Sequence, residues 1–280
     1  MPMGSAAVAA YRELLGAVLR SCREKAGLSP TQATKQLNWY SSVKIARLEA
    51  GAIKVPEDEL ERMLDLYEVP AGEAEKIRFF GEKARERPSR VTASESTFRA
   101  YVAEASEIKT YTDQLLPDLT QTVDYANALL STSLRTAPSD VGREARERVE
   151  AQRPLTAAGG PDLHIVTGEP ALLRPVGGRL VLRMQLEYLR GLIERSNVTF
   201  RVIPVDHGEH AGLGMAFTLL TMAVPAFTTI YTESLTSISY ADSRDEVDAY
   251  QLAFRRLTEA ALPAEDSAKL LDRRIDELVQ

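Results

Sequence analysis

Two histidines in a glycine-rich stretch are the residues best suited to chemistry. The stretch "DHGEHAGLG" (206–214) contains Asp206, His207, Glu209, His210 and Gly212. Imidazoles and carboxylates at this spacing can bind a metal ion or transfer protons, and glycines allow close approach to the backbone. The same pattern is typical of a polar loop between strands, in which backbone groups satisfy the histidine. We favour the loop, with a candidate ligand pocket at His207, His210 and Gly212.

Recognised catalytic and cofactor motifs are lacking elsewhere in the sequence. It contains no G-x-S-x-G, C-x-x-C or H-E-x-x-H, and no phosphate-binding loop follows a strand pattern. "RPVGG" (174–178) is most simply a turn before a helix, and His164 a strand residue. We therefore expect no enzymatic activity, no catalytic residues, no cofactor and no bound metal.

A second group of polar residues has the spacing of a DNA-reading motif. Its members are Thr31, Gln32, Ser41, Ser42, Val43, Lys44 and Arg47. Hydroxyl, aliphatic and guanidinium groups can read base edges, and a helix N-terminus can bind phosphate. We assign base reading to Ser42, Val43 and Arg47, and phosphate contacts to Thr31, Gln32 and Lys44.

Helical patterns place these residues on two short helices joined by a turn. Ser29 is a good N-cap before Pro30, and that helix runs to about Leu37. Asn38 can take the left-handed turn conformation, and Ser41 or Ser42 can cap the next helix. Ala33 and Leu37 would pack on Ile45 and Leu48. The alternative, an ordinary helical hairpin, fits the pattern alone equally well. Helices are also expected at about 11–26, 56–67 and 72–86.

Charge is distributed unevenly along an acidic chain. The net charge is −6, but residues 10–54 hold eight Lys or Arg and three Glu, a local charge of 8 − 3 = +5. Between Glu57 and Glu75 the sign reverses, with eight acids against Arg62. A basic segment on an acidic protein is consistent with a small DNA-contacting module, and equally with a solvated helix surface.

The 280 residues and 44% hydrophobic content predict roughly two soluble domains. No apolar run is long enough for a membrane span, so we expect a cytoplasmic protein with no membrane partner. The one cysteine, Cys22, lies on an apolar helical stripe and is interpreted as a core residue.

The predicted organisation is an N-terminal all-α helix-turn-helix domain of about five helices (1–86), a linker (87–96) and a C-terminal α+β domain (97–280). Within the C-terminal domain, helices are expected at about 97–109, 122–132, 140–152, 179–195, 242–261 and 264–277. Strand-like runs are "DLHIVTG", "NVTFRVIPV", "MAFTLLTM" and "FTTIYTE". These form a small sheet whose strand order the sequence does not give.

The segment "LGAVLRSCREKAGLSPTQATKQL…VKIARLEAG" resembles the Xre/Cro-type helix-turn-helix repressors. The resemblance implies that the third helix reads bases through Ser42, Val43 and Arg47. It also implies a structural ion pair between Arg23 and Glu49. Pro30 and Asn38 stand where the family usually has Gln and Gly, and "NWYSS" is one residue longer than common.

The remainder is similar to the large C-terminal domain of actinobacterial regulators of the WhiJ-like, antitoxin-like group. The similarity rests on "LLPDLTQTVDYANALL", "LHIVTGEPALLRPVGG" and "NVTFRVIPVDHGEHAGLGMAFTLL". Asp118 and Thr120 depart from its usual "PGLLQT". The resemblance implies a small partner protein encoded nearby.

Our leading interpretation is a sequence-specific transcriptional regulator that binds double-stranded DNA as a homodimer and whose C-terminal domain dimerises or senses a partner or ligand. The alternative is an antitoxin-like interaction module that neutralises a small partner, with DNA binding secondary.

Overall fold

The computed structural model describes residues 5–85, 93–224 and 226–279. The chain divides into two compact units: Met1–Glu104 with Met222–Phe227, and Ala105–Thr221 with Thr228–Gln280. Residues 87–92 of the expected linker (87–96) lie outside the described residues. Its last four residues begin helix α6 (Ala93–Glu104).

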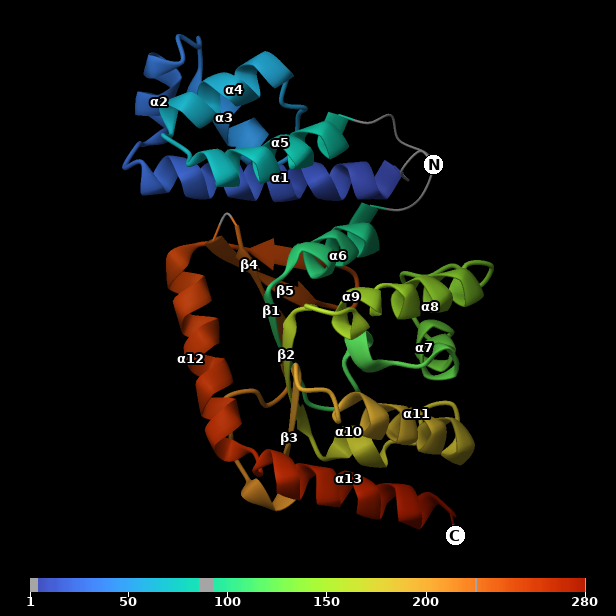
Figure 1. Ribbon diagram of the computed structural model, residues 1–280. Coiled ribbons are helices and arrows are strands. Elements are labelled where there is room, and N and C mark those ends of the chain that lie inside the picture. The colour runs from blue at the N-terminus through green and yellow to red at the C-terminus, as the bar shows by residue number, and fades with distance from the viewer. Residues whose placement is uncertain (1–4, 86–92, 225, 280) are drawn as a thin grey trace. The chain divides into compact units, whose positions relative to one another are not determined.

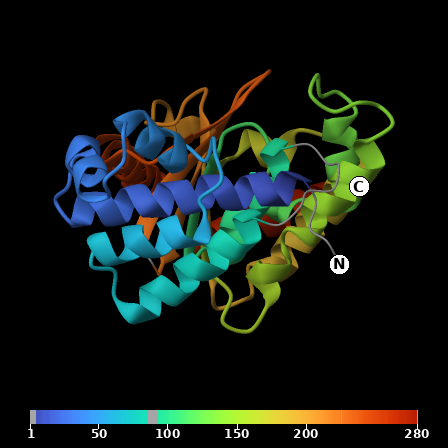
Figure 2. The same cartoon turned by 90° about the horizontal axis from the view of Figure 1, so that it is seen from above.

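The helix-turn-helix region consists of five helices. Their bounds are α1 Ser5–Lys25, α2 Pro30–Gln36, α3 Ser42–Glu49, α4 Glu57–Leu66 and α5 Ala71–Arg85. Figures 1 and 2 both show α5 running alongside α1. The expected all-α N-terminal domain is therefore confirmed.

The core of this unit is formed by the apolar faces that the helical spacing predicts. Leu14, Val18 and Leu19 of α1 are fully buried, and so is Ile45 of α3. At Gly16, an added Cβ would lie 2.5 Å from the carbonyl oxygen of Glu49. Glycine therefore lets the backbones of α1 and α3 approach closely.

Several helices of this unit end in the same left-handed turn. Asn38 follows α2 with φ 53°, its N–H donates to the Lys35 carbonyl at 3.2 Å, and the N–H of Trp39 donates to Thr34 at 3.0 Å. This is the Schellman arrangement, which satisfies carbonyls that the helix leaves free. Gly51 ends α3 in the same way with φ 66°. The left-handed conformation expected at Asn38 is confirmed.

The second unit is built on a mixed sheet with strand order β3-β2-β1-β4-β5-β6. The strands are β1 Glu107–Thr112, β2 Asp162–Gly168, β3 Val198–Ile203, β4 Ala216–Ala223, β5 Ala226–Glu233 and β6 Ile238–Ala241. β1 and β2 run parallel, as do β2 and β3, whereas β4 is antiparallel to β1. β1 thus has one parallel and one antiparallel neighbour.

The four predicted strands correspond to β2, β3, β4 and β5, but the helix expected at about 97–109 is wrong at its end. Helix α6 ends at Glu104, and Glu107–Thr112 is the strand β1. Apolar residues of "YVAEASEI" fit a helical face, and neighbouring strands that are distant in sequence decide the conformation instead. β6 was not predicted either.

Helices lie on both faces of the sheet (Figure 1). α12 (Arg244–Ala260) packs on one face through a core that includes Tyr111, Phe217, Phe254 and Leu257. The other helices of this unit are α7 Val123–Leu130, α8 Val141–Glu150, α9 Arg153–Thr156, α10 Pro170–Leu173, α11 Arg179–Leu192 and α13 Ala264–Val279. Two 3-10 turns, η1 (Asp118–Thr120) and η2 (Val205–His207), follow strand ends. The α+β class is confirmed. Among the described residues, no helix is long and apolar enough to cross a membrane.

Candidate DNA-binding surface

A capping box fixes the start of α2. The Ser29 hydroxyl accepts from the Gln32 N–H at 3.3 Å, and the Gln32 side-chain oxygen accepts from the Ser29 N–H at 2.8 Å. Pro30 occupies the first turn, where its missing N–H has no cost. Thr31 and Gln32 are both exposed, and the amide nitrogen of Gln32 stays available as a donor.

Helix α3 begins at Ser42, with Ser41 as its N-cap. The Ser41 hydroxyl accepts from the Val43 N–H at 3.2 Å. Ile45 and Leu48 face inward at 0% and 1% exposure, together with the buried Ala33 and Leu37 of α2. Two helices are thus packed together through apolar residues, with the N-terminal turn of the second helix directed to solvent. This is the geometry that a major-groove reader requires.

The predicted base-reading side chains lie on the accessible side of α3. Val43 is 61% exposed, Arg47 is exposed and Ser42 is partly exposed. Arg47 makes no hydrogen bond or ion pair with any residue that the structure describes. Its guanidinium fork is therefore free to bind a ligand.

Lys44 is held within the domain. Its ammonium lies 4.2 Å from the centre of the Trp39 ring and pairs with the carboxylate of Glu59 on α4. The sequence pattern predicts a phosphate contact for this ammonium, and its pairing with Glu59 competes with that role. We assign Lys44 instead to tying the turn before α3 to α4.

Tyr40 is a candidate contact that the sequence analysis missed. It precedes the N-cap of α3 and is fully exposed, at 107%. A residue at that position often packs against the fourth residue of the helix, here Ile45, in a hydrophobic staple. Ile45 is instead completely buried in the core of the unit, so the Tyr40 ring stays in solvent next to the start of α3. The available signal in the sequence was an aromatic residue directly before the N-cap serine.

A buried ion pair fixes α3 to α1. The Nε and Nη2 atoms of Arg23 donate to the two carboxylate oxygens of Glu49 at 2.6 and 2.9 Å, and both side chains are about 5% exposed. Arg23 also donates to the Leu28 carbonyl at 2.7 Å. The hydrogen bond to Glu49 raises the pKa of Arg23. The orientation of α3 thus depends on a bidentate pair below the reading surface.

The histidine-bearing loop after β3 is satisfied locally. His210 Nδ1 accepts from the Gly212 N–H at 3.3 Å, and its ring lies edge-on to Tyr111, 6.1 Å between centres. The His207 and His210 rings are 6.5 Å apart. A Cβ at Gly212 would lie 2.3 Å from the Tyr111 ring, so the glycine is needed for packing. No group of three metal-binding side chains occurs among the described residues.

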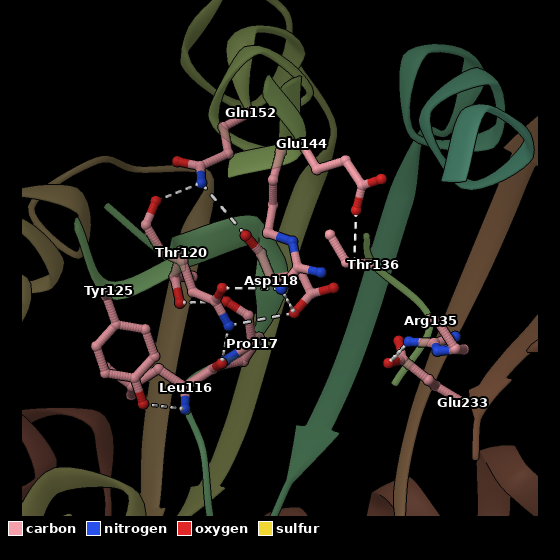
Figure 3. Close-up of polar contacts among 12 residues, drawn as sticks. Leu116, Pro117, Asp118, Thr120, Tyr125, Arg135, Thr136, Glu144, Gln152 and Glu233 are labelled. Atoms are coloured by element: carbon pink, nitrogen blue, oxygen red, sulfur yellow. Dashed lines mark hydrogen bonds and ion pairs between the residues drawn. The ribbon is translucent and has the colours of Figure 1, made fainter. Parts of the chain in front are cut away.

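The segment after β1 is anchored by a polar network (Figure 3). Asp118 accepts from Arg148 at 2.9 Å and from Gln121 at 3.1 Å, and Gln152 donates to the Gln121 carbonyl at 2.7 Å. Burial raises the pKa of Asp118, and Arg148 opposes this shift. Thr120 donates to the Pro117 carbonyl at 2.9 Å. The unusual Asp118 and Thr120 therefore have structural partners.

Two family models match separate parts of the chain. Residues 14–77 match a helix-turn-helix domain, which supports DNA binding by α2 and α3. Residues 96–273 match a domain of unknown function (DUF5753). The chain belongs to the DUF5753 family. No curated protein matches it. The DUF5753 match begins within α6 and includes the whole sheet, so it covers both the Asp118 network and the histidine-bearing loop.

Proposed function

We propose that this chain is a sequence-specific DNA-binding transcriptional regulator of the cytoplasm. The matched helix-turn-helix domain supports DNA binding, and the resemblance to Xre/Cro-type repressors and to the actinobacterial WhiJ-like group supports regulation. The observation that carries the proposal is the accessible face of α3. It presents Val43 in the first turn of the helix and a free Arg47 in the last turn, while Ile45 and Leu48 hold the opposite side in the core.

The chemistry at this surface fits double-stranded DNA. An arginine fork binds the O6 and N7 of guanine, and aliphatic groups contact the thymine methyl. The N-termini of α2 and α3 offer backbone N–H groups and hydroxyls to phosphate. Base reading is thus assigned to Ser42, Val43 and Arg47, and backbone contact to Thr31, Gln32 and Ser41.

The C-terminal domain is proposed to dimerise the protein or sense a partner or ligand, without catalysis. His210 is engaged with the backbone and with the Tyr111 ring, and the polar groups around Asp118 bind one another. A small protein encoded nearby is a candidate partner. The loop of His207, His210 and Gly212 is a candidate ligand site.

Selection of bound duplexes from a random DNA pool tests the proposal. We expect the full chain to enrich a defined sequence and to bind it with an affinity that falls as salt rises. Arg47→Glu should abolish enrichment without unfolding the protein, since Arg47 is exposed. Arg255→Glu reverses an exposed arginine of α12 in the other unit and is the matched control. A chain that enriches no sequence, or that binds equally well with Arg47→Glu, would favour the antitoxin-like alternative.

A further inference from the structure

An apolar row lies on the outer side of α11. The helix buries Leu182, Leu186 and Leu189, none more than 1% exposed. On another face, Leu180, Met184 and Tyr188 are 68%, 50% and 37% exposed, and the row continues at the exposed Gly191. Residues three or four apart are neighbours on a helix, so these four form a continuous strip. We call it the α11 strip.

Two features prepare the α11 strip for a close contact. The Tyr188 hydroxyl donates to the Gln152 side-chain oxygen at 2.7 Å, which holds the ring in one orientation while the residue stays 37% exposed. A fixed aromatic loses little conformational freedom on binding. A Cβ added at Gly191 would meet nothing within 4 Å. A large side chain from outside therefore has room there.

Charged residues of α11 and the turn after it alternate in sign beside the α11 strip. Arg183 donates to Glu187 at 2.8 Å, and Arg190 donates to Glu194 at 3.1 Å and to Asp272 of α13 at 2.7 Å. Along the chain the charges are positive at Arg183, negative at Glu187, positive at Arg190 and negative at Glu194. In the reverse direction every sign is inverted. These four charges are therefore complementary to those of a second copy that runs antiparallel.

We propose that the α11 strip is the homodimer surface of this protein. Two copies pack α11 antiparallel about a two-fold axis near Tyr188, with Met184 of one copy over Gly191 of the other. Arg183 of one copy then lies opposite Glu194 of the second, and Glu187 opposite Arg190. A surface that is complementary to itself is what a two-fold contact requires.

This inference rests on the proposed function in one respect: a dimeric regulator reads two half-sites. One helix face is smaller than the roughly 1,200 Å² typical of stable interfaces, so we expect a dissociation constant on the order of micromolar. Adjacent half-sites on DNA would then strengthen the pairing through effective concentration.

Sedimentation of the full chain without DNA tests the surface independently of DNA binding. We expect a monomer–dimer equilibrium over a concentration series extending to hundreds of micromolar. Met184→Arg and Gly191→Leu should each weaken it by about tenfold or more, as loss of a central interface residue does. Gly191→Leu fills open space, so it should leave the monomer folded. Leu252→Arg, which changes a 41% exposed leucine on α12, is the matched control.

A disulfide trap gives the second measurement. In a Met184→Cys/Gly191→Cys double variant, the two thiols of one chain lie two turns apart, too far to join each other. Oxidation should therefore link two chains, and the buried Cys22 should not compete. A wild-type chain that stays monomeric at every concentration would overturn the proposal. So would a dimer that Met184→Arg and Gly191→Leu leave unchanged, whether or not the protein binds DNA.

Discussion

Arg23 and Glu49 form a bidentate ion pair 26 residues apart in sequence, with N–O distances of 2.6 and 2.9 Å and no appreciable exposure to solvent. An exposed pair of the same geometry occurs in the same unit, where Arg78 binds Glu61 with both distances at 2.7 Å. The two pairs differ mainly in burial, which makes their comparison informative.

Glu49→Ala should lower the free energy of unfolding of the N-terminal unit by about 3–5 kcal/mol, because the buried Arg23 charge loses its bidentate carboxylate and keeps only the Leu28 carbonyl and the 3.5 Å contact with Glu24. Glu61→Ala should cost at most about 1 kcal/mol, since an exposed pair is screened by water. The one tryptophan, Trp39, lies in this unit, so its fluorescence during urea unfolding reports on the unit within the full chain. Equal losses for the two variants would contradict the stabilising role of burial.

Gly16→Ala should destabilise the N-terminal unit although alanine favours helices. Its Cβ would lie within 3 Å of the Leu48 and Glu49 carbonyl oxygens, which forces α1 and α3 apart. Gly72→Ala in α5 meets nothing within 4 Å and should be neutral or stabilising. Trp39 fluorescence during unfolding again gives the measurement. A Gly16→Ala variant as stable as wild type would show that the two helices can separate at little cost.

Alkaline pH should destabilise the N-terminal unit through Cys22. Burial raises the pKa of this thiol from 9.0 to about 11, so the folded unit keeps its proton where the unfolded chain has lost it. The stability that the protonated Cys22 contributes is therefore fully present below about pH 9. Between about pH 9 and 11 the free energy of unfolding falls by about 2–3 kcal/mol. Cys22→Ala should lack this part of the pH dependence. Parallel stability curves for wild type and Cys22→Ala across that range would refute the assignment.

Arg47→Ala should relax base preference at one position of each selected half-site, by about 1–3 kcal/mol. Binding to duplexes with single base-pair changes measures this. Lys44→Ala should leave the dependence of affinity on salt unchanged, because its ammonium already binds Glu59. If Arg47→Ala weakens all duplexes alike, Arg47 contacts the DNA backbone rather than a base.

Val43 and Tyr40 should make the protein sensitive to thymine methyl groups. Replacing thymine by deoxyuridine removes only that methyl, worth about 0.8 kcal/mol when buried against an apolar side chain. Wild type should lose affinity at one or two thymines, and Val43→Ala or Tyr40→Ala should lose this sensitivity. Leu235→Ala, which shortens a 71% exposed leucine in the other unit, is the control. Equal sensitivity of all four proteins to deoxyuridine would show that neither Val43 nor Tyr40 contacts a thymine methyl group.

The sequence predicted the helices and the turn of the helix-turn-helix better than the contacts of its side chains. Ser29, Pro30 and Asn38 act within a few residues of themselves, so their capping and turn roles follow from local rules. The contact between Lys44 and Glu59 does not follow from local rules, because Glu59 reaches Lys44 only once α4 has packed. The same holds for Tyr40, whose exposure depends on where Ile45 is buried.

In the second unit, runs rich in β-branched residues identified four strands, and the strand at Glu107–Thr112 was missed. Its burial pattern alternates only in part, because helices cover both faces of the sheet and Tyr111 is buried beside Thr110. Strand order was not predictable, since β1 pairs with a segment far along the chain.

The pairing of β1 with β4 also implies that the N-terminal helices and the sheet form at different times. Ser106 bonds to Thr221 across 115 residues, so the central strand stays incomplete until most of the chain has been synthesised. Contacts among helices α1 to α5 span shorter separations, such as the 72 residues between Arg12 and Ala84, so these helices should fold sooner by comparison. On the ribosome, the DNA-reading helices should therefore emerge and fold first. The nascent chain would then carry folded helices α2 and α3 before its sheet exists.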